Sequence, residues 1–246
     1  MLSLIGLARI NYIAYLQVAH YLKYRPSRHT RLIAKVCERI ERGELKRVMF
    51  FLPPRHSKSM TVTESFPSWF IGKNPNRRVI EVSYGESLAQ RFGRANRRKI
   101  ENFGNLLFDI EMARDNSSVT NWSIEGHDGG MISAGVGGPL SGQGSDCLII
   151  DDPCKNRQEA NSPTYRNMLW DEYRNTLLTR LQPNASIILI QTRWHEDDLA
   201  GRILAQEPEK WTVVKLPAEA EEEDPLGRVP GEPLWPEFGF DWAWIE

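Results

Sequence analysis

The sequence predicts an α/β fold with a central, mostly parallel sheet that is flanked by helices. Five short, strongly apolar runs have the composition of strands that are buried on both faces of a parallel sheet. They span 48–52, 79–84, 147–151, 186–191 and 211–216. Stretches with helical periodicity separate them, at 59–70, 86–100, 162–181 and 196–206. Strands that alternate with helices of this length indicate βαβ units.

Two further segments lie outside this alternation. Before the first strand, residues 2–22 and 31–42 have helical spacing, with Pro26 between the two predicted helices and Gly43 as a stop signal after the second. Residues 119–146 carry isolated apolar side chains between glycines. This segment predicts a hairpin followed by a glycine-rich loop at 135–144.

The 246 residues correspond to one large domain with a short appendage. We expect the domain at 1–216, including the N-terminal helices of 2–42. Residues 217–246 contain nine acidic residues, five prolines and one arginine. That composition predicts an extended acidic linker with no core of its own.

The near-zero net charge of −1 hides a polarised chain. Residues 1–120 carry 21 basic and 10 acidic residues, whereas residues 121–246 carry 10 and 22. This asymmetry fits a basic surface that meets a polyanion. The alternative is that the two halves mix in space and their fields cancel.

Cysteine content and hydropathy predict a soluble intracellular protein. The three cysteines form no CxxC pair and cannot all be bridged, which favours free thiols in a reducing compartment. Polar residues interrupt the apolar N-terminal stretch long before the roughly 20 residues that a membrane span needs. No basic segment precedes an unbroken apolar run, so a secretory signal is not expected.

A first candidate motif follows the first predicted strand. Residues 53–59 read PPRHSKS and lead into a helix, which is where phosphate-binding loops occur. Lys58 would place a positive charge on the β- and γ-phosphates, and the Ser59 hydroxyl would bind Mg²⁺. The usual glycines of such loops are replaced by Leu52 and Ser57. The alternative is an ordinary strand–turn–helix.

A second motif lies about 90 residues later. The apolar run 148–150 ends in Asp151 and Asp152. One carboxylate at the end of a strand can hold Mg²⁺ and the next can orient an attacking water. Ligands bind outside the carboxyl ends of the strands in open α/β sheets, so both motifs would open on one crevice. Alternatively, Asp152 and the following proline only start a turn.

The third motif is the end of the fourth strand. Gln191, Thr192 or Arg193 could sense the γ-phosphate from there. The sequence His195-Glu196-x-Asp198 suggests metal ligation, but acidic residues in the first turn of a helix more simply complement the helix dipole.

Together, PPRHSKS, the loop GVGGPLSGQGSD leading into LIIDDPCKN, and ILIQTRWHEDDL resemble the ATPase domain of the large terminase subunit of tailed bacteriophages. The resemblance covers about residues 25–216. It implies a P-loop NTPase of the RecA-like, ASCE type that hydrolyses ATP with Mg²⁺. The segment Pro26-x-x-His29 is similar to the adenine-side segment of this family.

The resemblance implies roles by position. Asp151 and Ser59 would hold Mg²⁺, and Asp152 stands where many relatives have a catalytic glutamate, with Glu159 as a possible helper. Arg55 resembles an arginine that acts on the γ-phosphate from within the loop. The residues expected to bind nucleotide are His29, Pro54, Arg55, His56, Ser57, Lys58, Ser59, Met60, Gln191 and Arg193.

A basic segment spans 77–99. Within it, Arg91, Arg94 and Arg98 share one helical face, and Arg97 lies beside that face. The face could be merely solvated, contact DNA phosphates, or supply an arginine finger to a neighbouring subunit.

The function implied is ATP-driven translocation of double-stranded viral DNA into a procapsid, in the cytoplasm of an infected bacterium. The implied partners are the portal protein, the small terminase subunit and further copies in a ring, with a monomer expected in isolation and no membrane contact. No nuclease activity is expected, because the chain stops in the acidic linker where a nuclease domain would begin. The alternatives are a helicase-like ATPase, and a degenerate nucleotide-binding scaffold.

Overall fold

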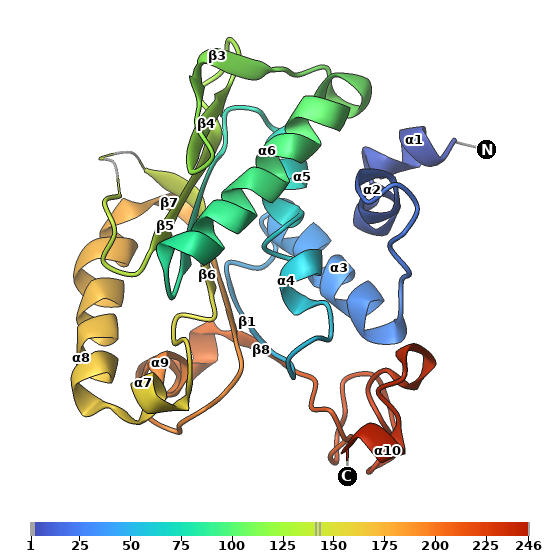
Figure 1. The fold of residues 1–246 in the computed structure, drawn as a ribbon, viewed down its shortest axis with the longest axis vertical. Coiled ribbons are helices and arrows are strands. Elements are labelled where there is room, and N and C mark those ends of the chain that lie inside the picture. The colour runs from blue at the N-terminus through green and yellow to red at the C-terminus, as the bar shows by residue number, and fades with distance from the viewer. Residues whose placement is uncertain (1–2, 141, 143, 246) are drawn as a thin grey trace.

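The computed structural model describes residues 3–140, 142 and 144–245, and its centre is one mixed sheet of eight strands. The strand order is β3-β4-β5-β2-β6-β7-β1-β8. Strands β5, β2, β6, β7, β1 and β8 run parallel, whereas β3 and β4 add an antiparallel hairpin at one edge. Helices flank the sheet, as Figure 1 shows. The predicted mixed α/β architecture is confirmed.

Five of the strands, β1, β2, β6, β7 and β8, coincide with the apolar runs of the sequence. The strand bounds are β1 Arg47–Phe51, β2 Arg78–Ser83, β3 Met112–Ser117, β4 Asn121–Ile124, β5 Gly130–Gly135, β6 Ser145–Asp151, β7 Leu181–Gln191 and β8 Thr212–Lys215. The central strands β1, β6 and β7 are buried over nearly all of their apolar residues. Burial on both faces explains why they read as unbroken apolar runs.

The helices pack on both faces of the sheet. Their bounds are α1 Leu4–Ala8, α2 Tyr12–Ala19, α3 Arg28–Glu41, α4 Lys58–Thr61, α5 Phe66–Lys73, α6 Glu86–Phe108, α7 Arg157–Asn161, α8 Pro163–Glu172, α9 Leu199–Gln206 and α10 Trp242–Ile245. Short π- and 3₁₀-helical turns extend α8 through Arg180. None of the described helices is long and apolar enough to cross a membrane.

Alternate residues of the strands feed two cores. Val48 and Phe50 of β1 join the core with α1, α2, α3 and α5, whereas Met49 of the same strand joins the core with α8 and α9. The same alternation holds in β6, where Ile149 and Ile150 belong to opposite cores. The helices of each face therefore fix the sheet from opposite sides, and the strand ends are left to carry a site.

Several helix predictions are wrong in their continuity. The single helix predicted at 2–22 is two helices, because Asn11 caps a new start by accepting a hydrogen bond from the backbone N–H of Ala14 at 2.9 Å. The helix predicted at 59–70 stops after Thr61 and restarts at Phe66. Pro67 lacks the N–H that a continuous helix needs there. Residue 2 lies outside the described part.

Other boundaries also differ. Helix α6 continues to Phe108, beyond the predicted end at residue 100. Helix α9 begins only at Leu199, because the Asp198 side chain caps it by accepting from the N–H of Gly201 at 2.9 Å. The segment 119–146 does contain β4 and β5, but their partner β3 is missing from the prediction, and residues 141 and 143 of the predicted loop lie outside the described residues. Strand β3 is largely exposed, so it lacks the apolar pattern of an inner strand.

The segment predicted as an extended linker folds back on the domain. Its described residues form short bridges, and Leu234 and Trp235 are buried. Asp224 and Arg228 form an ion pair at 2.7 Å whose side chains are almost wholly buried. Figure 1 shows this segment in red beside the start of α3, where Arg28 donates to Glu232 and to the carbonyl oxygen of Leu226. Its acidic composition therefore hides local packing; residue 246 lies outside the described part.

Candidate functional site

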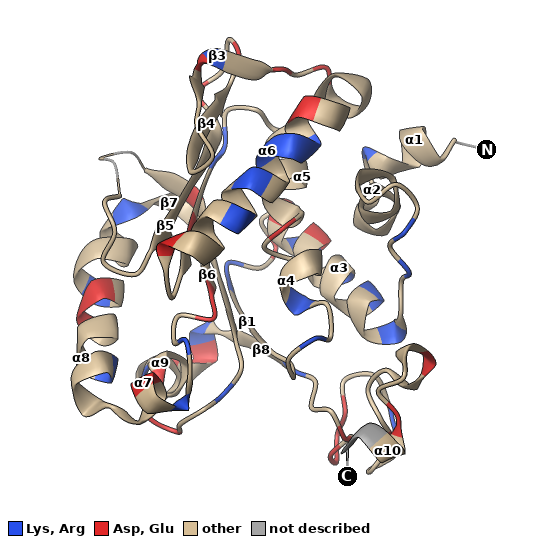
Figure 2. Ribbon diagram, in the orientation of Figure 1, with Lys and Arg blue, Asp and Glu red and all other residues tan. Residues whose placement is uncertain are grey.

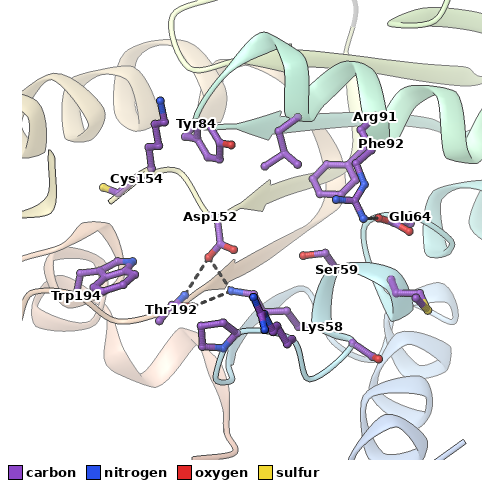
Figure 3. A pocket seen from close by; sticks show the side chains of 16 residues that line it. Lys58, Ser59, Glu64, Tyr84, Arg91, Phe92, Asp152, Cys154, Thr192 and Trp194 are labelled. Atoms are coloured by element: carbon purple, nitrogen blue, oxygen red, sulfur yellow. Dashed lines mark hydrogen bonds and ion pairs between the residues drawn. The ribbon is translucent and has the colours of Figure 1, made fainter. Parts of the chain in front are cut away.

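A cleft of about 470 Å³ opens at the carboxyl ends of the central parallel strands. The loop after β1 and the start of α4 form one wall, the residues after β6 and β7 form a second, and the N-terminal half of α6 forms the third (Figure 3). This is the edge of an open α/β sheet where ligands bind. Its size is that of a small-molecule site.

Lys58 is the central cation of the cleft. It is the first residue of α4, and its ammonium donates to Oδ1 of Asp152 at 2.7 Å and to Oγ1 of Thr192 at 2.9 Å. The same Oδ1 of Asp152 accepts the backbone N–H of Thr192 at 3.0 Å. Thus residues that follow β1, β6 and β7 meet at one point, as the first two motifs predicted and Figure 3 shows.

The loop before Lys58 has an unusual backbone. Arg55 and Ser57 have φ angles of 65° and 58°, and Asp152 across the cleft has a φ of 45°. Residues other than glycine seldom adopt this left-handed region, and such residues cluster at functional sites. Ser57 occupies a conformation that suits glycine, the residue that phosphate-binding loops usually carry at this position.

Asp151 is the buried acid beside the cleft. Its side chain has no exposed surface, and its Oδ2 accepts a hydrogen bond of 2.5 Å from Oγ1 of Thr63. Burial, and then the charge of neighbouring Asp152, raises the pKa of Asp151 to about 7, while Lys58, Thr63 and Ser59 act in the opposite direction. Its Oδ1 has no hydrogen-bond partner among the described residues. An orphaned carboxylate oxygen beside a serine hydroxyl fits Mg²⁺, which takes oxygen ligands.

Most residues of the predicted phosphate loop line the cleft. Besides Lys58, these are Pro54, Arg55, Ser57, Ser59 and Met60. Among residues 54–60, the exception is His56, whose ring is buried against Phe240 with ring centroids 4.4 Å apart. His56 therefore faces the folded C-terminal segment, away from the cleft.

His29 is also buried and does not line the cleft. Its Nε2 lies 3.2 Å from the carbonyl oxygen of His56, and its ring is edge-on to that of Trp235. Burial lowers the pKa of His29 to about 4. A buried neutral ring held this way supports the back of the loop rather than a ligand in the cleft.

The third motif is only partly at the site. Thr192 reaches Lys58, whereas Gln191 is buried behind it, in a small pocket of about 10 Å³ that Asp152 also lines. Arg193 is turned away, and its Nε donates to Asp198 at 2.6 Å. Because Asp198 both caps α9 and binds Arg193, its carboxylate is already engaged, and this argues against metal ligation there.

Glu159 lies outside the cleft. Its backbone N–H is capped by the Asn156 side chain at 3.0 Å, and its Oε2 accepts the N–H of Lys155 at 2.8 Å. These two bonds close the first turn of α7. The structure therefore does not bring Glu159 to Lys58 or Asp152.

The four arginines of α6 differ in their surroundings. Arg91 lines the cleft and pairs with Glu64 at 2.6 Å, although its side chain is 67% exposed. Arg97 is held by Glu101 and by the carbonyl oxygen of Ser117. Arg94 and Arg98 are exposed. Figure 2 shows the resulting basic bands on successive turns of α6.

Some residues at the site are absent from the sequence-based prediction. Tyr84, Lys155 and Trp194 line the cleft from the ends of β2, β6 and β7, where position after a strand was an available signal. Thr63 and Glu81 are buried polar residues that approach Asp151. Neither belongs to a recognisable motif, so only the fold reveals them.

Comparisons with known proteins show which family the chain belongs to. The family model described as terminase large subunit, T4likevirus-type, N-terminal, matches residues 49–241. The crystal structure of the HK97 bacteriophage large terminase is similar with a TM-score of 0.48 and 10% identity, over 83% of this chain and 42% of that one. No curated protein matched the chain. Because the family model covers well over half of its residues, the chain belongs to the T4likevirus-type terminase large subunit family, through the N-terminal region of that family.

Proposed function

We propose that this chain is the ATP-hydrolysing part of a motor that moves double-stranded viral DNA into a procapsid. The observation that carries the proposal is the convergence of Lys58 and Asp152 at one cleft, with Asp151 buried beside them. A cation, a buried acid and a partly exposed acid are the groups that phosphoryl transfer requires. Family membership supports the link to DNA packaging.

The proposal includes a P-loop NTPase fold of the RecA-like type. Strand β7 lies between β1, which leads to Lys58, and β6, which leads to Asp151 and Asp152. Thr192 at the end of β7 can therefore contact both the cation and the second acid. This strand order supports a nucleotide site that is formed by residues at the ends of three adjacent strands.

The nucleotide phosphates would lie along the loop 54–60. Lys58 would bind the β- and γ-phosphates, and Ser59 and Asp151 would hold Mg²⁺, which supplies charge neutralisation when bound. Arg55, exposed in the loop, would add positive charge near the γ-phosphate. We assign no direct nucleotide contact to His29, His56, Gln191 or Arg193, because their side chains are buried or engaged elsewhere.

Asp152 would orient the attacking water. In the ion pair it shares one oxygen between Lys58 and the N–H of Thr192. A bound phosphate would compete for Lys58, and this competition would leave the Asp152 carboxylate held by the backbone of Thr192 alone. Water orientation by a fixed carboxylate is a general-base role.

The remaining proposals concern assembly. DNA phosphates would meet the exposed arginines of α6, in a sequence-independent and salt-sensitive way. The portal protein, the small terminase subunit and further copies in a ring are the proposed partners, in the cytoplasm of an infected bacterium. Arg91, which lines the cleft of its own chain, would act on the nucleotide of its own subunit.

ATP binding and turnover, measured with and without Mg²⁺, test the proposal. Lys58→Ala is expected to abolish turnover and weaken binding, because no other lysine reaches the Asp152 carboxylate among the described residues. Lys46→Ala is the matched control, since Lys46 is exposed and bonds Asn184 at 2.8 Å. Turnover of Lys58→Ala within about twofold of wild type would refute the phosphate loop. Nucleotide binding without turnover would favour a degenerate scaffold.

A further inference from the structure

We propose that Thr63 is a positioning residue that orients the Asp151 carboxylate toward a bound divalent cation; this inference rests on the proposed function. Thr63 is fully buried and follows α4. Its Oγ1 donates to Oδ2 of Asp151 at 2.5 Å across 88 positions of sequence. The other oxygen, Oδ1, keeps no partner within the described residues and is left for the cation.

The geometry of Thr63 depends on a break between α4 and α5. Pro67 prevents a continuous helix, so the carbonyl of Thr63 is not used by a helical N–H four residues later. The Asn96 side chain of α6 donates to that carbonyl at 2.8 Å, and the Oδ1 of Asn96 accepts the N–H of Ser68 at 3.0 Å. Asn96 is itself fully buried. The backbone of Thr63 is therefore fixed by α6, and its hydroxyl has a fixed direction.

A purely structural role of Thr63 would have different consequences when the residue is replaced. A buried threonine often satisfies its hydroxyl on a nearby carbonyl. Thr63 instead bonds the carboxylate that the cation would use, and residues that hold a metal ligand tune the affinity of the metal by about 10–100-fold. The two roles differ in what the Thr63 hydroxyl controls, because orientation of Asp151 changes cation affinity whereas packing changes stability.

The test compares Thr63→Val with Thr63→Ser and a control. Valine keeps the shape and removes the donor, and serine keeps the donor. Thr61→Val is the matched control, because Thr61 is equally buried but its Oγ1 bonds Tyr24 at 2.7 Å, away from Asp151. The readouts are Mn²⁺ affinity in the presence of ADP by electron paramagnetic resonance, nucleotide binding in EDTA, thermal melting, and ATP turnover against Mg²⁺ concentration.

We expect Thr63→Val to weaken Mn²⁺ binding and raise the Mg²⁺ requirement by about 10–100-fold, with nucleotide binding in EDTA unchanged. Thr63→Ser should have the Mn²⁺ affinity and the Mg²⁺ requirement of wild type. Thr61→Val should lower the melting temperature without changing the Mn²⁺ affinity or the Mg²⁺ requirement. Equal Mn²⁺ affinity in Thr63→Val and wild type would overturn the inference about Thr63 and leave the proposed function standing. The inference would also be overturned if Thr63→Val and Thr63→Ala were recovered only as unfolded protein while Thr61→Val folded. A wild-type chain that binds no Mn²⁺ with ADP would overturn the proposed function as well.

Discussion

The ammonium of Lys58 lies 2.7 Å from Oδ1 of Asp152, although 94 positions separate the two residues in the sequence. The Lys58 side chain is 7% exposed and that of Asp152 is 30% exposed. The pair thus lies at the inner wall of the cleft, where solvent screens it less than a surface pair. A phosphate that binds Lys58 must replace Asp152 as its partner, which links nucleotide binding to the position of the second acid.

The two adjacent acids are expected to fail in different ways when each is changed to asparagine. Asp151→Asn should lose Mg²⁺-dependent nucleotide binding, because it removes the charge of the proposed cation ligand. Asp152→Asn should bind ATP and Mg²⁺ but hydrolyse ATP about 10²–10⁴-fold more slowly, the usual range for loss of a general base. Nucleotide binding and single-turnover hydrolysis measure the two steps separately.

Glu159→Gln is the control for this pair, since Glu159 lies outside the cleft and bonds the backbone of Lys155. We expect its turnover to match wild type. If Asp152→Asn hydrolyses ATP normally while Glu159→Gln does not, the water-orienting role belongs to Glu159, and the side chain must move to reach the cleft.

Ser57→Gly is expected to stabilise the protein. Ser57 has a φ of 58°, a left-handed conformation that costs other residues about 1–2 kcal/mol, partly offset by the greater entropy of an unfolded glycine. The net gain should be about 0.5–1 kcal/mol in the free energy of unfolding, measured by denaturant titration. Ser57→Ala keeps the strain and should show no gain. A destabilised Ser57→Gly would mean that the serine side chain holds the loop.

The inner strands, and the meeting of Lys58 with Asp152, could be predicted from the sequence because both leave local signals. Strands β1, β6 and β7 are buried on both faces and so read as apolar runs. Lys58 lies in the loop-to-helix segment after β1, Asp151 is the last residue of β6, and Asp152 follows it. Long-range contacts leave no such signal. His56 belongs to the loop motif, yet its ring turns toward Phe240, which is remote in sequence and lies in the segment predicted to be an unpacked linker.

The direction of individual side chains is the second feature that the sequence could not predict. Spacing placed Arg91, Arg94 and Arg98 on one face of α6, which the exposure of all three matches. It could not show that Glu64, in the break between α4 and α5, draws Arg91 alone to the cleft. Similarly, the periodicity of 59–70 predicts one continuous helix and gives no sign that Thr63, in the break between α4 and α5, contacts Asp151.

Arg91 is expected to contribute to turnover from within its own subunit. Arg91→Ala should lower ATP turnover with little change in ATP affinity, because a cation near the phosphates acts mainly in the transition state. Arg94→Ala is the matched control on the same helix face, and it lies outside the cleft lining. Steady-state turnover and equilibrium ATP binding on the same preparations measure the difference.

Mixing tests whether the arginine acts in the same or a neighbouring subunit. A mixture of Arg91→Ala with Lys58→Ala should recover no activity, and turnover per subunit should not depend on protein concentration. Recovery in the mixture would instead mean that Arg91 completes the site of another copy.

The double variant Arg94→Ala/Arg98→Ala should keep turnover and weaken DNA binding, with a shallower salt dependence.

Glu81 gives a prediction for stability against pH. It is fully buried on β2, where the Ser83 hydroxyl donates to it and Ser133 lies opposite on β5. Burial, and secondarily the nearby Asp151, raises the pKa of Glu81 well above the ordinary glutamate value. The folded protein therefore favours the neutral acid, whereas the unfolded chain ionises near pH 4.3.

The sign of the effect follows from proton binding. Above the pKa of the unfolded chain, the folded state holds one more proton at Glu81, so its contribution to stability falls by about 1.4 kcal/mol per pH unit until the pKa of the folded state is reached. Glu81→Gln keeps an acceptor for Ser83 and cannot ionise. Its free energy of unfolding relative to wild type should therefore rise with pH from about pH 5 upward, until the raised pKa of Glu81 in the folded protein is reached. Denaturant titrations at several pH values measure this difference, with exposed Glu209→Gln as the control whose difference from wild type should be constant. A constant difference for Glu81→Gln as well would mean that the Glu81 carboxylate is ionised in the folded protein and is compensated by its neighbours.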